Sequence, residues 1–321
     1  MSDALDPATW TPDTVEVLAR DLEEWGAVAL CLPRKQLREH LPRGRADRLH
    51  AWVRANGAAD PRRVARRPAV VKPASTGGRT HLVIGDCHAA PGQDLRRFAW
   101  LGKMIREVNP AVVVQIGDWY SMDSLCAHRT LADRAEESVA ADLRAGSMAL
   151  SLLEAELGGW GGRKIITLGN HDDRVRQLSD GQPWLRDLHN VGAEHADAGW
   201  EVVPYLRPCR VDGIAYVHYL CSAGGGRAIA GKFHALRLLE RVKFHESVVV
   251  GHSHRLQWRT ERRPGKSVHA LVAGCYFEHV EDYAGEDNGE WWRGVCVLRN
   301  VVDGDYDLET WSIDRIRARW G

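Results

Sequence analysis

Five apolar segments of this 321-residue chain each end in residues that can bind a metal ion. The run 164–168 leads into Gly169, Asn170 and His171. The other four segments end in the same way, at Asp86-Cys87-His88, at Asp118, at His218 and at His252-Ser253-His254. Short apolar runs of this kind predict buried strands. Because open α/β sheets build their sites at the carboxyl ends of strands, we expect these side chains to converge, provided that the strands share a sheet.

The composition narrows the class of protein. Lys+Arg and Asp+Glu both number 43, so the net charge of zero predicts no general affinity for polyanions. The seven cysteines are scattered without a C-x-x-C pair, which argues against a disulfide framework and for a reducing compartment. No apolar run approaches the roughly 20 residues of a membrane span, and the acidic start does not resemble a secretory signal. We predict a soluble, cytoplasmic protein with no membrane partner.

Residues 1–57 are predicted to form a small helical segment. Thr11-Pro12-Asp13 is typical of a helix start, and further helices are expected near 35–41 and 45–55. The break between these two has the length of a helix-turn-helix turn. Residues 58–79 are rich in Pro, Arg, Ala and Gly, which predicts a linker before a domain at 80–321.

The charges of this N-terminal region leave two interpretations open. Residues 1–32 carry seven acidic residues and one basic residue, a net of −6, whereas 33–72 carry twelve basic and three acidic residues, a net of +9. Arg45, Arg48 and Arg54 could contact a nucleic-acid backbone from the third helix. The alternative is a small helical cap with solvated arginines.

From Thr80 onward, predicted strands alternate with predicted helices. The helices are expected near 94–108, 131–157 and 228–242. Besides 164–168, strands are expected near 83–85, 111–117, 213–220, 247–251, 268–272, 294–298 and 306–311. The region from 170 to 213 is less regular. This alternation predicts an α/β domain without internal repeats.

The residue types at the strand ends suit a transition metal. Carboxylate oxygen mixed with imidazole favours Mn, Fe or Zn over an all-oxygen Mg or Ca site. Asp86 and His88 stand at i and i+2, as do His252 and His254, so each pair can face one side of an extended chain. One such pair would mean little in a chain with 15 histidines, but five segments in order are a strong signal. Separate structural or surface histidines are the alternative.

In these segments the chain resembles the calcineurin-like metallophosphoesterases. The resemblance covers roughly residues 80–315 and includes Asp86-Cys87-His88, Gly117-Asp118, Gly169-Asn170-His171-Asp172, His218 and Gly251-His252-Ser253-His254. It implies a four-layer α/β/β/α sandwich of two mixed sheets flanked by helices. Gly117–Ser124, Gly169–Arg174 and the glycines after His218 look most like phage-encoded members. Cys87 departs from the pattern, and its thiol could either compete for a softer metal or face the core.

The resemblance also implies the roles of the site residues. One divalent transition-metal ion would be held by Asp86, His88 and His254, a second by Asn170, His218 and His252, and Asp118 would bridge both. Mn²⁺ is the expected ion, and Fe, Zn or Ni would also suit. A water between ions about 3.5–4 Å apart would lose a proton and attack the phosphorus.

Three residues near Asn170 and one on a later loop complete the predicted site. His171 is expected to stabilise the transition state or protonate the leaving oxygen, with Asp172 orienting it. Arg174 and Arg227 are the predicted substrate contacts. Asp172 and Arg174 could equally be a helix-start acid and a surface base.

Two further motifs have competing interpretations. Residues 226–232 spell G-x-x-x-x-G-K, but Phe233 follows where a nucleotide-binding P-loop has Ser or Thr. A loop that contacts substrate phosphate is the better fit. Trp291 and Trp292 follow an acidic stretch and could stack on a base or lie in the core.

These features predict a metal-dependent phosphoric ester hydrolase. We expect a phosphodiesterase that acts on a nucleic acid, as a nuclease, or on a cyclic nucleotide. A phosphomonoesterase using the same site is one alternative, and a DNA-binding protein with an inactive phosphoesterase domain is another. The basic residues 33–72 favour a nucleic-acid substrate, whereas the neutral overall charge does not. The substrate, the metal and the oligomeric state stay open.

Overall fold

The computed structural model describes residues 12–31, 35, 38–39, 41–56, 78–126, 138–182, 191–222, 226–242, 245–280 and 288–321. The chain divides into two compact units, Met1–Thr76 and Gly77–Gly321. Within these ranges, no helix combines the length and the apolar character needed to cross a membrane.

The described part of the N-terminal unit contains the helices α1 (Pro12–Cys31) and α3 (Arg43–Asn56). Their apolar faces share a small core formed by Leu18, Leu41, Ala46, Leu49 and Val53. The guanidinium of Arg45 forms an ion pair with the buried carboxylate of Asp21 on α1. Part of the predicted helix 35–41 lies outside the described residues, and Arg38 and Glu39 form a turn.

The second unit contains two mixed sheets. The larger has the strand order β11-β10-β1-β2-β3-β4, and the smaller has the order β5-β6-β7-β9-β8. The larger sheet consists of β1 (Arg79–Ile84), β2 (Val112–Gln115), β3 (Arg163–Thr167), β4 (Glu201–Val203), β10 (Gly294–Val302) and β11 (Asp305–Ser312). The smaller sheet consists of β5 (Cys209–Val211), β6 (Ile214–Tyr216), β7 (Ser247–Val250), β8 (Leu256–Arg263) and β9 (Lys266–Ala273).

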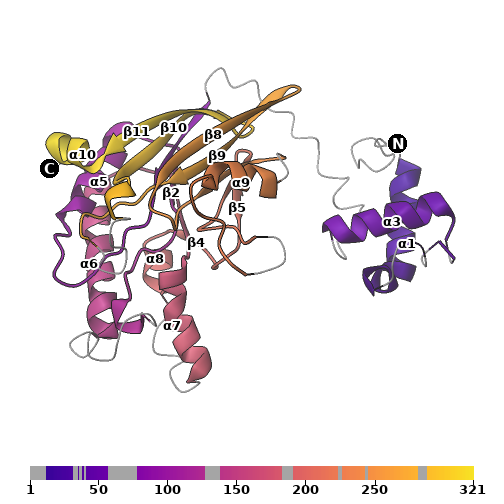
Figure 1. The fold of residues 1–321 in the computed structure, drawn as a ribbon, viewed down its shortest axis with the longest axis horizontal. Coiled ribbons are helices and arrows are strands. Elements are labelled where there is room, and N and C mark those ends of the chain that lie inside the picture. The colour runs from indigo at the N-terminus through magenta and orange to yellow at the C-terminus, as the bar shows by residue number, and fades with distance from the viewer. Residues whose placement is uncertain are drawn as a thin grey trace. The chain divides into compact units, whose positions relative to one another are not determined.

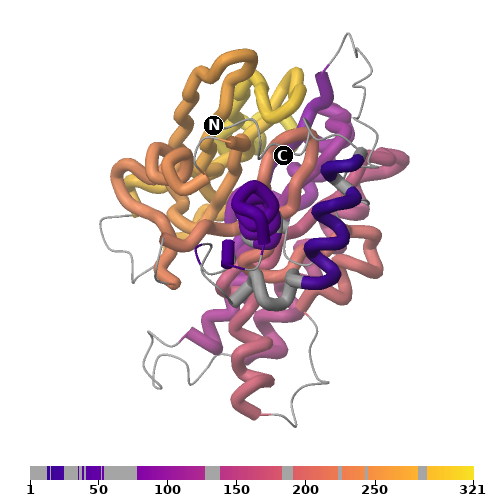
Figure 2. Tube along the Cα trace, turned by 90° about the vertical axis from the view of Figure 1, so that its right-hand side faces the viewer, coloured from indigo at the N-terminus to yellow at the C-terminus, as the bar shows by residue number. Residues whose placement is uncertain are grey.

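Helices cover the outer faces of both sheets (Figure 1). The larger sheet is covered by α5 (Arg96–Val108), α6 (Val139–Leu157) and α10 (Ile313–Trp320), and the smaller sheet by α9 (His234–Arg241). This unit also contains α7 (Asn170–Gly181) and two shorter elements, α8 (Ala193–Asp197) and the 3-10 helix η3 (Asp123–Leu125). In both views α7 extends away from the sheets (Figures 1 and 2). The predicted four-layer sandwich is confirmed.

Alternation along the strands distributes side chains between the layers. In β1, Leu82 and Ile84 pack with the helices that cover the larger sheet, while Val83 faces the smaller sheet. In β7, Val249 faces the larger sheet and Val248 packs with α9. Because these strands are buried on both faces, their sequences are continuous apolar runs.

The structure differs from the predicted elements at several places. The predicted helix 228–242 begins only at His234, because Gly231 has a left-handed φ of +95°. The predicted helix 131–157 is observed from Val139, and residues 131–137 lie outside the described ranges. Strand β8 was not expected because it is a charged, largely exposed edge strand. Strand β1 begins at Arg79, inside the predicted linker.

Candidate metal centre

The five strand ends converge, although they do not belong to one sheet. Strands β1, β2 and β3 are parallel neighbours in the larger sheet, so the loops with Asp86, Asp118 and Asn170 lie side by side. Strands β6 and β7 are parallel neighbours in the smaller sheet and carry His218 and His252. The condition that all five strands share a sheet is therefore wrong. The residues meet because the two sheets pack face to face through one apolar core.

Glycines precede the ligands because the carboxylates approach the backbone closely. A Cβ atom on Gly169 would lie 2.1 Å from Oδ1 of Asp118. A Cβ atom on Gly251 would lie 2.3 Å from Oδ1 of Asp86. A side chain at either position would displace a carboxylate, which explains the Gly-Asn and Gly-His pairs.

Four of the seven predicted ligands have left-handed backbones. The φ angles are 42° at His88, 52° at Asp118, 70° at His252 and 57° at His254. Such conformations cost free energy for residues with a Cβ atom and cluster at functional sites. The surrounding hydrogen bonds must therefore hold these loops in place.

Gln115 ties two of the ligand loops together. Its side-chain amide donates to the carbonyls of Gly85 at 3.3 Å and Gly117 at 2.7 Å, and its oxygen accepts from the Gly117 amide at 2.9 Å. The side chain is fully buried. A single polar residue in the apolar run 112–116 thus fixes the ends of β1 and β2. That exception in the apolar pattern was a usable sequence signal, which we missed.

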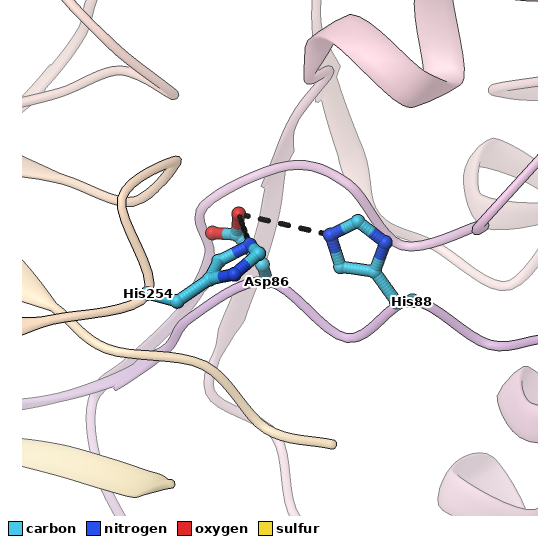
Figure 3. Close-up of side chains that lie close together, drawn as sticks. All are labelled: Asp86, His88 and His254. Carbon is cyan, nitrogen blue, oxygen red and sulfur yellow. Dashed lines mark ion pairs between the residues drawn. The ribbon is translucent and has the colours of Figure 1, made fainter. Parts of the chain in front are cut away.

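Asp86, His88 and His254 form the first group of candidate ligands (Figure 3). Nε2 of His254 lies 3.0 Å and Nε2 of His88 lies 3.9 Å from Oδ2 of Asp86. Figure 3 shows both rings pointing a nitrogen toward this one carboxylate. All three side chains are buried.

Asp118, Asn170, His218 and His252 form the second group. Oδ2 of Asp118 lies 3.2 Å from Nε2 of His218. The amide oxygen of Asn170 lies 2.9 Å from the same nitrogen and 3.0 Å from Nδ1 of His252. Oδ2 of Asp118 is also 3.8 Å from Nε2 of His88. Asp118 therefore lies between the two groups.

The chemistry of these residues fits divalent metal ions. Both ring nitrogens of His88 are buried and have no hydrogen-bond partner among the described residues, an arrangement that costs about 1–3 kcal/mol unless something binds them. Burial lowers the pKa of His88 well below its usual value and that of His252 to about 4, so both rings are neutral, as ligands must be. Neutral imidazoles grouped with buried carboxylates are therefore prepared for divalent ions.

The protonation of two further ligands, His218 and Asp118, is set by the groups around them. Nδ1–H of His218 donates to the Ile116 carbonyl at 2.7 Å, which leaves Nε2 toward Asp118. Burial lowers the pKa of His218, but Asp118 and Asp86 raise it to about 9. Burial also raises the pKa of Asp118, but the neighbouring histidines, His218 first, hold it well below its usual value. Asp118 is thus a carboxylate.

His171 lies beside both groups without the predicted partner. Its Nδ1–H donates to the Ser121 carbonyl at 2.6 Å, and its Nε2 accepts from Nη2 of Arg174 at 3.2 Å. Its ring centroid is 4.4 Å from that of His88, and it forms a third metal-compatible group with His88 and Asp118. The Ser121 carbonyl therefore orients this imidazole.

Asp172 does not orient His171, so that prediction is wrong. Its Oδ2 accepts from the backbone amides of Asp118 and Gly169, both at 2.8 Å, and its Oδ1 accepts from the Tyr120 amide at 3.1 Å. The reason is that α7 begins at Asn170, and successive side chains on a helix point about 100° apart. Asp172 instead joins the loop after β2 to the start of α7.

The two predicted substrate contacts lie in different surroundings. Nη1 of Arg174 donates to the carbonyls of Ser121 and Met122, both at 3.0 Å, so this arginine is part of the His171 environment. Arg227 is exposed. Among the described residues, no hydrogen bond or ion pair connects the Arg227 side chain to the candidate ligands. The P-loop interpretation lacks its geometry, because β6 ends at Tyr216, well before residues 226–232.

Cys87 faces the interior. Its thiol is fully buried and donates to the Gly85 carbonyl at 3.5 Å, and burial raises its pKa. A protonated, buried thiol is not a metal ligand.

Two aromatic neighbours of the ligands gave no sequence signal, namely Phe277 beside His88 and Tyr219 beside His252.

The fold and the paired Asp/His groups define an α/β/β/α sandwich with a metal-binding centre where the two sheets meet. The chain belongs to the calcineurin-like phosphoesterase family, whose model matches residues 80–294. Family membership implies a metal-dependent phosphoester hydrolase, and together with the His/Asp groups it points to divalent metal ions. A solved structure with a similar chain is TT1561 of Thermus thermophilus, at 12% sequence identity and a TM-score of 0.38, covering 74% of this chain and 99% of that one. No curated protein matches the chain.

Proposed function

We propose that the chain is a dinuclear metal-dependent phosphodiesterase that acts on a nucleic acid or a cyclic nucleotide. The observation that supports this proposal is the position of Asp118. Its carboxylate lies within 4.8 Å of the donor atoms of His218 and His252 in one group, and of His88, a member of the other group. Asp118 suits a bridging role. The first ion would be held by Asp86, His88 and His254, and the second by Asn170, His218 and His252. We propose Mn²⁺ because the donors mix carboxylate and amide oxygen with imidazole, although Fe, Zn or Ni would also suit.

When bound, two divalent ions supply charge that neutralises phosphoryl oxygens and activates water for attack. The chain contributes preorganisation. Asp172 and Gln115 hold the ligand loops through buried hydrogen bonds, so little rearrangement is needed when negative charge develops on the phosphoryl group.

His171 and Arg174 act together in this proposal. His171 carries its proton on Nδ1, so its Nε2 is an acceptor in this structure. Burial lowers the pKa of His171, and the Arg174 charge lowers it further, which disfavours the doubly protonated ring that a general acid requires. Of the two roles predicted for His171, electrostatic stabilisation therefore fits better, and it acts through Arg174, which supplies the positive charge and donates to Nε2 of His171.

Three narrower statements remain predictions. These are the likeness to phage-encoded members, the cytoplasmic location and nucleic-acid contact through residues 33–72. The presence of all seven candidate ligands favours a catalytic centre over an inactive phosphoesterase domain.

The test is a hydrolysis screen of the full chain loaded with Mn²⁺, using aryl monoesters, aryl diesters, cyclic nucleotides, DNA and RNA. We expect diesters to be hydrolysed faster than monoesters. Asp118→Asn should reduce turnover more than any other ligand change, because it removes the bridging carboxylate. Asp314→Asn, whose side chain is 81% exposed on α10, is the matched control and should leave turnover unchanged. Near-native turnover of Asp118→Asn with two ions bound would disprove the bridging role, and a preference for monoesters would make the protein a phosphomonoesterase.

A further inference from the structure

An indole ring that is not part of any core borders the first group of ligands. Trp291 is half-buried, and its centroid lies 4.5 Å from that of His254 with the ring planes at 90°. The next residue, Trp292, packs against the apolar core between the sheets. Among the described residues, Trp291 belongs to none of the four apolar clusters. The two tryptophans thus have different surroundings.

Contacts with Phe277 and Arg293 fix the orientation of the Trp291 ring. Phe277 is fully buried and meets three rings nearly edge to face, those of His88 at 5.0 Å, His254 at 5.1 Å and Trp291 at 5.5 Å. The guanidinium carbon of Arg293 lies 5.7 Å from the indole centroid. Aromatic edge-to-face contacts restrict ring orientation, so Trp291 is a rigid surface.

The backbone around Trp291 is tied to the ligand loop. The Trp292 amide donates to the His254 carbonyl at 2.9 Å, and Arg255 forms an ion pair with Glu290. The acidic charge of Glu290 next to the indole is therefore compensated. A substrate with negative charge can approach this side of the site more readily than the acidic stretch before Trp291 suggests.

We propose that Trp291 is a stacking platform for the nucleobase of a phosphate ester bound at the metal centre. This inference rests on the proposed function and adds the residue that recognises the base of such a substrate, because stacking on an indole favours a nucleotide unit over a simple alkyl or sugar phosphate. A half-buried, rigid indole beside a ligand histidine places an aromatic face within one nucleoside of the reacting phosphate. Every base offers a π face, so stacking of this kind tolerates all four bases.

The experiment measures the binding of AMP and of inorganic phosphate to the Mn²⁺-loaded full chain by calorimetry. AMP should bind wild type more tightly than phosphate. Trp291→Ala should weaken AMP binding about 5- to 100-fold, the usual range for losing one stacked base, and leave phosphate binding and metal content unchanged. Trp291→Phe should retain most of the AMP affinity. Trp258→Ala, at a tryptophan that is 47% exposed on β8, is the matched control and should change neither affinity.

The outcomes separate this inference from the proposed function. Wild type that binds phosphate and AMP equally well would overturn the stacking platform alone. If the wild type binds neither AMP nor phosphate, the proposed phosphate site at the metal centre is wrong as well. A parallel loss of AMP and phosphate in Trp291→Ala would also overturn the inference, because it would show that Trp291 only supports the ligand His254.

Discussion

At the scale of single residues, the neighbours of His171 determine which of its ring nitrogens carries a proton. The Ser121 carbonyl accepts a hydrogen bond from Nδ1–H and Arg174 donates to Nε2, so a second proton on the ring would be placed against a guanidinium. A general acid contributes most when the leaving oxygen is a poor leaving group. An electrostatic stabiliser of the phosphoryl oxygens instead contributes similarly whatever the leaving group is.

We therefore predict that His171→Ala lowers turnover by about 10²–10³-fold on both a nitrophenyl diester and a nucleoside diester. Elemental analysis should show that both ions are retained. Arg174→Ala should give the same pattern, and Arg174→Lys should restore part of the rate. A loss much larger on the nucleoside diester would identify His171 as a general acid, and loss of an ion would make it a ligand.

At the scale of elements, the short helix α8 is anchored by a buried histidine. The His195 ring lies among the rings of Trp119, Tyr120 and Trp200, with centroids at 5.0, 6.2 and 5.9 Å. Neither ring nitrogen has a hydrogen-bond partner among the described residues. Burial lowers the pKa of His195 to about 4. The unfolded chain therefore binds a proton at this position below about pH 6.5, while the folded chain does not until about pH 4.

Stability contributed by a neutral His195 should be fully present at neutral pH and lost as the pH falls from about 6.5 to 4. Between pH 7 and 5 this residue should cost the wild type about 2 kcal/mol of unfolding free energy, given its folded pKa of about 4. His195→Phe should lack that part of the decrease, as measured by urea unfolding at both pH values. His245→Gln, at an exposed position, is the control and should behave as wild type. An equal decrease in unfolding free energy between pH 7 and 5 for wild type and His195→Phe would show that His195 does not cause this pH dependence.

The elements also show which parts of the structure a sequence can predict. The strand ends were predictable because each apolar run stops at a ligand, in four of the five cases after a glycine. At Gly169 and Gly251 the close approach of a carboxylate requires that glycine. The hydrogen-bond partners of Asp172 were not predictable, because they depend on the residue at which α7 begins. Strand β8 was missed because an edge strand can be charged on both faces. The division of the ligands between two sheets follows from packing of segments far apart in the chain, which local pattern does not encode.

At the scale of the whole molecule, the candidate chemistry lies in one of the two units. Every candidate ligand lies within Gly77–Gly321, whereas the stretch of net charge +9, residues 33–72, lies within Met1–Thr76. Part of that charge is compensated inside the unit, since Arg45 pairs with Asp21, an acidic residue outside the stretch. Of the three arginines predicted to contact a nucleic acid, Arg45 is thus already engaged. The arginines at 62, 63, 66 and 67 have no acidic residue between them.

Deleting residues 1–76 should leave hydrolysis of a small aryl diester unchanged and weaken binding to DNA or RNA at low salt by about 10-fold or more. The difference between the full and truncated chains should shrink as salt rises, because phosphate contacts release counterions. Changing the four arginines at 62, 63, 66 and 67 to Glu in the full chain should reproduce the loss, which separates their charge from the helical core of the unit. Polymer affinity can be measured by fluorescence anisotropy at 50 and 200 mM salt. If the truncated chain binds nucleic acid at 50 mM as tightly as the full chain, the N-terminal unit is a helical cap and any nucleic-acid contact lies in the phosphoesterase domain.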